Sequence, residues 1–328
     1  MAATAVPPAT GPWRVATRRS ALARAQAQQV ADALAEVTGR PAELVPMSTT
    51  GDEHPERAFE AFDTKGLFVD NTRRAVLSGD CHFVVHSYKD LPNEAAPGLV
   101  IAAVPRRVDP RDALITREGH RLANLPRDRP VIVGTSSARR KAQLQRSRRD
   151  VLVQPIRGNL DTRLGKVAGG ELDGVVVAMA GLIRMGGSDL DLRVVPLEHG
   201  EMLHAAAQGA LAIECRGDDA ATRKALRRLD HPDTRVCVTA ERELLAHLGG
   251  GCTSPIGAHA ELVPGESDGT RRIELLGMMS DPNGTRLFRA SHQAAASEPE
   301  LLGRTLAASL IAARQQAEGP PGHGHGGH

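Results

Sequence analysis

Aromatic residues are scarce in this sequence: Phe, Trp and Tyr make up 2% of its 328 residues. The hydrophobic cores must therefore be built from Val, Leu, Ile and Ala. Single-stranded nucleic acid is bound through aromatic side chains on which bases stack, and no such platform accompanies the basic run from Arg139 to Arg149. The formal net charge of +2 is also too small to indicate nonspecific binding, so we expect no nucleic-acid partner.

Cysteine is rare as well. The four cysteines, Cys81, Cys215, Cys237 and Cys252, lie far apart and form no C-x-x-C pair. We therefore expect no structural metal, no disulfide framework and a reducing, cytoplasmic location. No apolar run is long enough to span a bilayer, which predicts no membrane partner. The sequence also lacks a GxxxxGK[ST] loop, and no GxGxxG motif follows a predicted strand.

Both ends of the chain have a low-complexity composition. Residues 1–12 contain no apolar stretch of the kind that signal peptides have, and we expect them to be a disordered leader. Residues 319–328 are glycine, proline and three histidines. We favour a flexible tail over a metal site there, because nothing fixes the geometry of the ligands.

Strands alternate with helices over the first part of the chain, which predicts two α/β units with mainly parallel sheets. The expected strands of the first unit are 13–16, 42–47, 81–86 and 99–104. Those of the second unit, which starts near residue 109, are 131–133, 151–156 and 174–179. Residues 205–215 read as one more strand. Three consecutive strands between two helices in 232–316 predict a smaller α+β domain with an antiparallel three-stranded sheet.

Arginines gather where the predicted strands end. They are Arg18, Arg19, Arg139, Arg140, Arg157, Arg163 and Arg184. The guanidinium fork matches a carboxylate or phosphate, and ligands of open α/β sheets bind beyond the carboxyl ends of strands, so we predict a cleft for a polyanion. Helix N-termini at Ser20, Ser136 and Asn159 would add backbone N–H donors. Solvated surface arginines are the alternative, which we favour for the three arginines between residues 146 and 149.

Two loops carry reactive side chains. His86–Asp90 places a lysine beside an aspartate after a strand, and a carboxylate there can stabilise a developing cation; a helix cap or a surface ion pair would explain it equally. Gly249–Gly257 places Cys252 in a pliable glycine-rich loop, where the thiol can face a cleft. The alternative for Cys252 is an ordinary buried cysteine.

Seven stretches carry longer motifs, and they are Val15–Ser20, Lys65–Phe68, Val85–Pro92, Asp109–Ala113, Gly134–Arg140, Ile156–Leu164 and Gly250–Gly257. In this order they resemble the porphobilinogen deaminase (hydroxymethylbilane synthase) family over residues 13–316. The resemblance implies two periplasmic-binding-protein-like α/β domains and a smaller C-terminal α+β domain that carries the cofactor cysteine. The implied boundaries are 13–106 plus 205–224 for domain 1, 107–204 for domain 2 and 225–318 for domain 3.

The resemblance also implies a function in tetrapyrrole and haem biosynthesis. The family is a transferase that joins four porphobilinogen molecules head to tail, releases ammonia and yields hydroxymethylbilane. It uses a dipyrromethane cofactor bound covalently, here through a thioether to Cys252, and we expect a cytoplasmic monomer. The implied catalytic residues are Asp90, Lys89 and Arg18. Cofactor contacts are implied for Cys252, Lys65, Ser87, Asp90, Ser136, Arg139, Arg140 and Gly158. Substrate contacts are implied for Arg18, Ser20, Arg157, Arg163, Arg184 and Gln208.

Three positions depart from the family pattern. Ala61 stands where a lysine is frequent, and Tyr88 is the hydrophobic residue of the catalytic stretch. His204–Gly209 replaces the usual Pro-Ala-x-Gly-Gln-Gly, so a Pro and a Gly are lost at a point where domain mobility is expected. We expect an active enzyme. The alternatives are a slower or specialised paralogue, and a two-lobed protein that binds a carboxylated molecule without chemistry.

Overall fold

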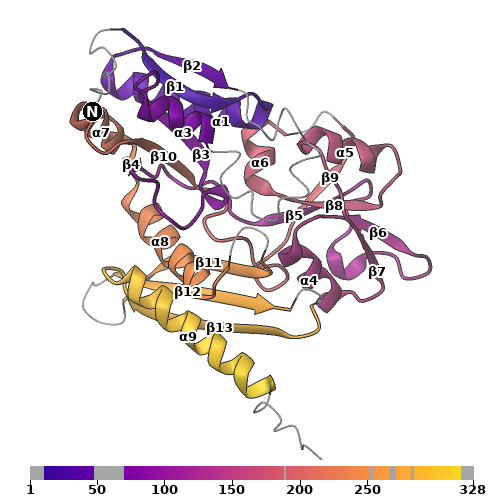
Figure 1. Ribbon diagram of the computed structural model, residues 1–328. Coiled ribbons are helices and arrows are strands. Elements are labelled where there is room, and N and C mark those ends of the chain that lie inside the picture. Colours follow the sequence, from indigo (N-terminus) through magenta and orange to yellow (C-terminus); the bar gives the residue numbers. More distant parts are fainter. Residues whose placement is uncertain are drawn as a thin grey trace, which may run out of the picture.

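The computed structural model describes residues 11–47, 70–187, 190–250, 254–265, 271–281 and 284–318. Figure 1 shows three sheets, each covered by helices. Within these ranges no helix combines the length and apolar character needed to cross a membrane. The expected class, two α/β units followed by a smaller α+β unit with a three-stranded antiparallel sheet, is confirmed.

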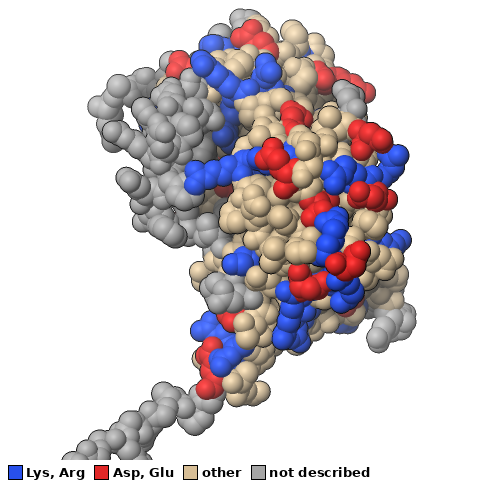
Figure 2. All heavy atoms as spheres, turned by 90° about the vertical axis from the view of Figure 1, so that its right-hand side faces the viewer, with Lys and Arg blue, Asp and Glu red and all other residues tan. Residues whose placement is uncertain are grey.

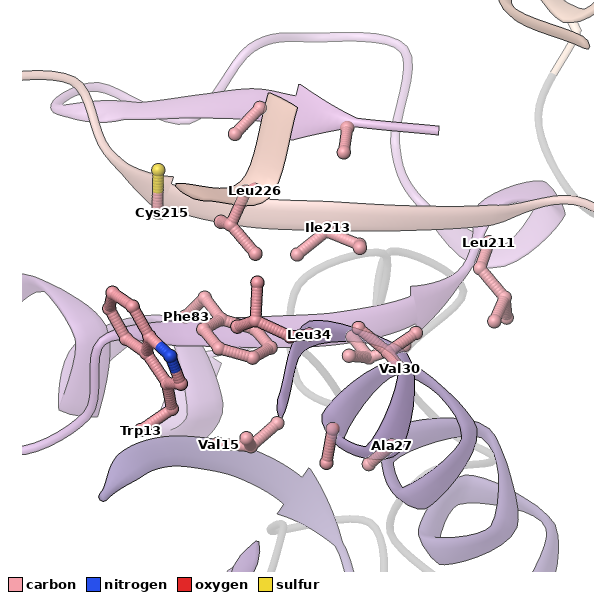
Figure 3. Close-up of a cluster of buried hydrophobic side chains, with 14 residues drawn as sticks. Trp13, Val15, Ala27, Val30, Leu34, Phe83, Leu211, Ile213, Cys215 and Leu226 are labelled. Carbon is pink, nitrogen blue, oxygen red and sulfur yellow. The ribbon is translucent and has the colours of Figure 1, made fainter. Parts of the chain in front are cut away.

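The first sheet has the strand order β2-β1-β3-β10-β4. Its strands are β1 (Trp13–Arg18), β2 (Ala42–Met47), β3 (Phe83–Ser87), β4 (Leu99–Ala103) and β10 (Leu211–Arg216), and its helices are α1 (Ala21–Thr38), α3 (Asp70–Leu77) and α7 (Ala220–Leu226). The apolar face of α1 packs on this sheet. In Figure 3 the side chains of Leu34, Phe83, Ile213 and Leu226 point toward one another, and all four are fully buried. This core is aliphatic apart from Trp13, Phe83 and Cys215, as the composition predicts.

The second sheet has the order β7-β6-β8-β5-β9. Its strands are β5 (Asp112–Thr116), β6 (Val131–Gly134), β7 (Val151–Gln154), β8 (Gly174–Ala178) and β9 (Arg193–Pro196), and its helices are α4 (Ala138–Ser147), α5 (Leu160–Ala168) and α6 (Met179–Arg184). The chain enters this sheet after β4. It returns to the first sheet through residues 197–210, which we call the return segment.

The third sheet is an antiparallel meander of β11 (Ile256–Pro264), β12 (Arg271–Ser280) and β13 (Leu287–Ala295). The helices α8 (Pro232–His247) and α9 (Pro299–Glu318) lie side by side against it (Figure 1). Gly277 permits this contact, because a Cβ there would lie 2.8 Å from Leu244 and 2.9 Å from Leu306. Alternation of buried and partly exposed residues along β12 shows that one face of the sheet is solvated.

The structure corrects three expectations. Each large sheet is mixed, with two parallel and two antiparallel pairings, and is not mainly parallel. The strands β5 and β9 were not predicted; β5 begins with a charged residue, Asp112, whose burial depends on partners from another element. The strand predicted for 205–215 begins only at Leu211, because the preceding residues form a tight turn in which Ala207 has a φ of 59°.

Candidate active site

A cleft of about 980 Å³ opens between the first two sheets. From the first it is lined by the end of β1, the start of α1 and the turn after β3, and from the second by residues 158–163 and the α6 region. The predicted site residues that line it are Arg18, Ser20, Ser87, Lys89, Asp90, Arg140, Gly158, Arg163 and Arg184. The acidic residues of the lining besides Asp90 are Glu94 and Asp161. The cationic residues therefore outnumber the acidic ones.

Asp90 reaches the cleft on a short 3-10 turn, Tyr88–Asp90, that follows β3 directly. Tyr88 is buried beneath it, whereas Asp90 is exposed. Arg242 of α8 holds the turn from behind: its guanidinium lies 4.6 Å from the Tyr88 ring centroid and donates to the carbonyls of Tyr88 (3.3 Å), Leu91 (3.2 Å) and Pro92 (2.6 Å). The aromatic residue at position 88 thus contributes a cation–π contact.

Arg242 is a positioning residue that the sequence analysis missed. It lies within a regular helix, and no turn, glycine or motif singles it out. Only the packing of α8 behind the Tyr88–Asp90 turn shows its role, since the contact joins residues about 150 positions apart.

Lys89 connects the cleft to a buried polar network. Its ammonium lies 3.2 Å from Oε1 of Gln208, whose amide nitrogen donates to the Pro110 carbonyl (2.8 Å) and to Oδ1 of Asp112 (2.9 Å). Burial lowers the pKa of Lys89, partly offset by the charge of Asp90. Gln208 is itself buried at the end of the return segment and does not line the cleft.

Asp112 is the centre of that network. Its carboxylate accepts from Nη1 of Arg139 (2.7 Å) and from Nη2 and Nε of Arg140 (2.7 and 3.1 Å), and all three side chains are buried. Burial raises the pKa of Asp112, but the two guanidiniums outweigh this and hold the pKa well below its usual range. One carboxylate faces two guanidiniums, so a positive charge remains at the side where Arg140 meets the cleft. Arg139 instead donates to the Leu203 carbonyl in the return segment (2.6 Å).

Two arginines of the cleft have no carboxylate partner among the described residues. Arg163 donates to the Gly158 carbonyl (3.0 Å), and Arg184 donates to the Gly209 carbonyl (2.7 Å). Nε of Arg184 is buried without a hydrogen-bond partner in the described part of the chain. Burial lowers the pKa of Arg184 to about 10, and burial together with Arg140 lowers the pKa of Arg163. Desolvated guanidiniums of this kind favour an anionic ligand.

Helix N-termini add donors on both sides of the cleft. Ser20 caps α1 by accepting from the Ala23 N–H (3.3 Å), as predicted, and residues 20–23 line the cleft. Asn159 caps α5 through the Thr162 N–H (2.9 Å). Gly158 precedes it with a φ of 99°, and a Cβ there would meet Thr162 at 2.7 Å, so this turn requires glycine.

Several predicted residues lie elsewhere. Ser136 does not cap α4 as predicted, since Ser137 does so; Ser136 instead ties the ends of β6 and β7 together through the Ile156 N–H and carbonyl. Arg157 is exposed, and neither Ser136 nor Arg157 lines the cleft. Lys65, Cys252 and Ala61 lie outside the described residues. Arg148, expected to be solvated, is only 3% exposed, because it donates to carbonyls of the loop around Leu122 and pairs with Asp150.

The other three cysteines are buried. Burial raises the pKa of Cys81 to about 11 and that of Cys215 and Cys237 to about 12. Such thiols are poor nucleophiles. Cys252 itself comes two residues after Gly250, which lines the cleft.

The charged surface gives no sign of a nucleic-acid groove on the face shown in Figure 2. Basic and acidic side chains are interspersed there among uncharged ones. The distribution fits the small net charge of +2.

Comparisons with known proteins agree with this geometry. Residues 13–224 match the family model "Porphobilinogen deaminase, dipyromethane cofactor binding domain", and residues 235–312 match "Porphobilinogen deaminase, C-terminal domain". Porphobilinogen deaminase of Acidothermus cellulolyticus is 47% identical over 304 residues, which cover 92% of this chain and 88% of that protein. Porphobilinogen deaminase 1 of Streptomyces coelicolor is 44% identical over 311 residues, covering 91% and 94%.

Among solved structures, a substrate-binding domain of a putative amino acid ABC transporter from Streptococcus pneumoniae has 12% identity and a TM-score of 0.41, over 66% of this chain and 90% of that one. An ancestral cationic amino acid solute binding protein has 14% identity and a TM-score of 0.40, over 67% and 88%. The family assignment depends on the sequence matches, which span most of the chain. The chain belongs to the porphobilinogen deaminase family, and residues 13–224 form its dipyrromethane cofactor binding domain.

Proposed function

We propose that the protein is a hydroxymethylbilane synthase, which joins four porphobilinogen molecules head to tail with release of ammonia. The observation that carries the proposal is the position of Asp90. Its carboxylate lies exposed in a cleft that also holds Lys89 and the arginines Arg140, Arg163 and Arg184. The family assignment supports a biosynthetic, cytoplasmic role, and we propose a monomer from the family resemblance alone.

The residues of the cleft fit a dipyrromethane cofactor. Each pyrrole of the cofactor and of the substrate carries two carboxylates, so a growing chain is strongly anionic. Arg163 and Arg184 offer guanidiniums without a described carboxylate partner, and α1 offers the N–H groups of its first turn. We place the thioether at Cys252, since the three described cysteines are buried and the glycine-rich loop continues from the lining of the cleft. When bound, the cofactor supplies the pyrrole to which the first substrate is joined.

Each residue then has a part in the chemistry. Asp90 accepts hydrogen bonds from pyrrole N–H groups, and its charge stabilises the cation that ammonia leaves on the substrate. Lys89, whose Nζ is held by Gln208 beside that carboxylate, compensates a substrate carboxylate. Arg18 and Ser20 contact substrate from the first sheet, and Arg163 and Arg184 do so from the second, where Arg140 contacts the cofactor.

Bound substrate would therefore bridge two lobes. We assign domain 1 to residues 13–106 and 205–224, domain 2 to residues 107–204 and domain 3 to residues 225–318. The return of β10 to the first sheet supports this division. For Lys65, Ser136 and Arg157, the expected contacts come from the family resemblance alone. Arg139 and Gln208 act through their hydrogen bonds to Asp112.

The test combines intact mass with turnover. The purified chain is expected to carry a mass increment of two linked pyrroles, absent in Cys252→Ser, and to release ammonia from porphobilinogen. Asp90→Asn is expected to lower kcat by about 10²- to 10³-fold, because one preorganised charge at the developing cation is lost. Reversible binding of porphobilinogen without ammonia release would refute the proposal and leave a non-enzymatic binder. Slow but complete turnover would indicate a specialised paralogue.

A further inference from the structure

Three histidines meet where the return segment packs on the third sheet. His199 and His204 belong to the return segment, and His259 is on β11. One ring nitrogen of each lies within 4.8 Å of one ring nitrogen of the others. We propose that His199, His204 and His259 form a binding site for a divalent transition-metal ion of the Zn²⁺ class, outside the cleft and independent of the proposed activity.

The distances suit a single ion. Nε2 of His204 lies 2.9 Å from Nδ1 of His259, and the rings of His199 and His259 stack with centroids 3.7 Å apart. Two Zn–N bonds of about 2.0–2.1 Å at a tetrahedral angle separate the nitrogens by about 3.4 Å, which lies between the 2.9 Å contact of the two nitrogens and the 4.8 Å limit. Small side-chain rotations therefore suffice to bring the three nitrogens to an ion.

The surroundings orient the rings as metal ligands. Nδ1 of His204 lies 2.9 Å from the Ala205 carbonyl and donates to it, which leaves the lone pair of Nε2 facing His259. Nε2 of His259, on the far side of its ring, lies 3.9 Å from a carboxylate oxygen of Glu261. Ligating histidines usually donate their second ring nitrogen to a carbonyl or carboxylate, as His204 does to the Ala205 carbonyl. Nδ1 of His199 is buried without a hydrogen-bond partner among the described residues, a need that an ion would satisfy.

The arginines whose charge acts on the cluster are already paired with carboxylates. Arg107, whose charge acts on His204 and His259, is paired with the buried carboxylate of Glu241 at 2.7 and 2.9 Å. Arg111, whose charge acts on His199, is paired with Asp109 at 2.8 Å, so the repulsion of a cation is offset. A water can complete four-coordination.

A bound ion would join two parts of the fold. The Ala258 N–H already donates to the His204 carbonyl (2.9 Å), and a Cβ on Gly257 would lie 2.9 Å from the Leu203 carbonyl, so β11 approaches the return segment closely. The ion would cross-link this contact just after the loop that contains Cys252. We expect it to stabilise the packing of the third sheet against the first two.

The test uses the full chain, with His323, His325 and His328 changed to Asn in every variant so that the histidine-rich tail does not bind the metal. Co²⁺ is titrated and its visible absorption recorded. The expected result is one ion per chain with the strong bands of a four-coordinate site. His204→Asn and His259→Asn are expected to weaken binding by at least about 100-fold, whereas His247→Asn, an exposed histidine of α8, leaves it unchanged.

A second readout separates ligand loss from misfolding. Far-UV circular dichroism and the metal-free Tm establish that each variant is folded, and His199→Asn provides a substitution at a partly exposed position. Zn²⁺ is expected to raise the Tm of the tail-substituted chain and of His247→Asn, but not that of the cluster variants. Loss of all binding when the tail histidines are replaced would overturn the proposal, as would Co²⁺ binding that the cluster substitutions do not affect.

Discussion

Asp112 offers the sharpest test of how the cleft is supported. Its carboxylate accepts four hydrogen bonds, three from Arg139 and Arg140 and one from Gln208, at 2.7–3.1 Å. Asp112→Asn preserves the shape but removes the charge, and the amide nitrogen then faces guanidinium N–H groups. Removing one partner of a buried ion pair costs about 3–5 kcal/mol of unfolding free energy, because the remaining charge stays buried.

The loss is measurable as a change in thermal stability. In a protein of this size each kcal/mol corresponds to about 2–4 °C, so we expect the Tm to fall on the order of 10 °C. Scanning calorimetry or dye-based melting measures it. Asp150→Asn is the matched control, since Asp150 also pairs with a buried arginine but is itself largely exposed, and surface pairs contribute little.

Activity gives a second, independent readout. Asp112 holds Gln208, which in turn contacts Lys89, and it holds Arg140 at the cleft. Asp112→Asn is therefore expected to lower kcat/KM at a temperature where the variant is still folded. A Tm equal to that of Asp150→Asn would refute the reasoning, because it would mean that two buried guanidiniums tolerate the loss of their shared carboxylate.

Three further predictions concern the cleft and the first sheet. Arg184→Gln is expected to raise the KM for porphobilinogen about tenfold or more, since a hydrogen bond to a charged group contributes about 1.5–3 kcal/mol; Arg146→Gln, an exposed control, should leave it unchanged. Arg242→Met is expected to lower kcat more than it raises KM, because the turn that carries Asp90 loses its support, and equal effects on both would contradict a positioning role. Burial raises the pKa of Glu214, but His86 and Arg73 outweigh it and lower the pKa to about 2. Because its pKa is depressed in the folded state, ionised Glu214 contributes about 3 kcal/mol to the free energy of unfolding at pH values above its unfolded pKa, near 4.3. This contribution is lost as the pH falls toward 2. Tm measured from pH 5 to pH 2 should therefore fall less steeply for Glu214→Gln, and parallel curves would refute the assignment.

The helices and most strands were predictable because their signals are local. Ser20 at the start of α1 and Asn159 at the start of α5 are good N-caps, and both side chains accept the expected N–H bond. The three-stranded sheet was predictable from three successive alternating segments. The motif around Asp90 placed a carboxylate at the end of a strand, and the structure places it in the cleft.

What the sequence did not predict depends on distant partners. Arg139 and Arg140 follow the same turn, yet only Arg140 lines the cleft. Arg139 donates its hydrogen bonds to Asp112 and to the Leu203 carbonyl. Neighbouring helical residues point in directions about 100° apart, so adjacency in sequence does not imply a shared role. Arg242 and the histidine cluster also depend on packing between elements that are far apart in sequence, and no local pattern marks such contacts.

The return segment shows how the departures from the family pattern affect one point of the fold. Ala207 stands where the pattern has glycine, and its φ of 59° costs an L-residue about 1–2 kcal/mol. Its methyl group is fully buried in the hydrophobic cluster that includes Tyr88 and Val104, which recovers about 0.8 kcal/mol.

The strained conformation is held by a network around Glu241. Glu241 accepts from the Ala207 N–H (2.7 Å) and the Ala260 N–H (2.8 Å) and is paired with Arg107, which also donates to the Gln208 carbonyl. The net cost of alanine is therefore small, but alanine has fewer alternative backbone conformations than glycine. The return segment joins the two lobes. Alanine at position 207 therefore restricts how this segment can rearrange as the bound pyrrole chain grows, and it affects the motion of the segment more than the stability of the fold.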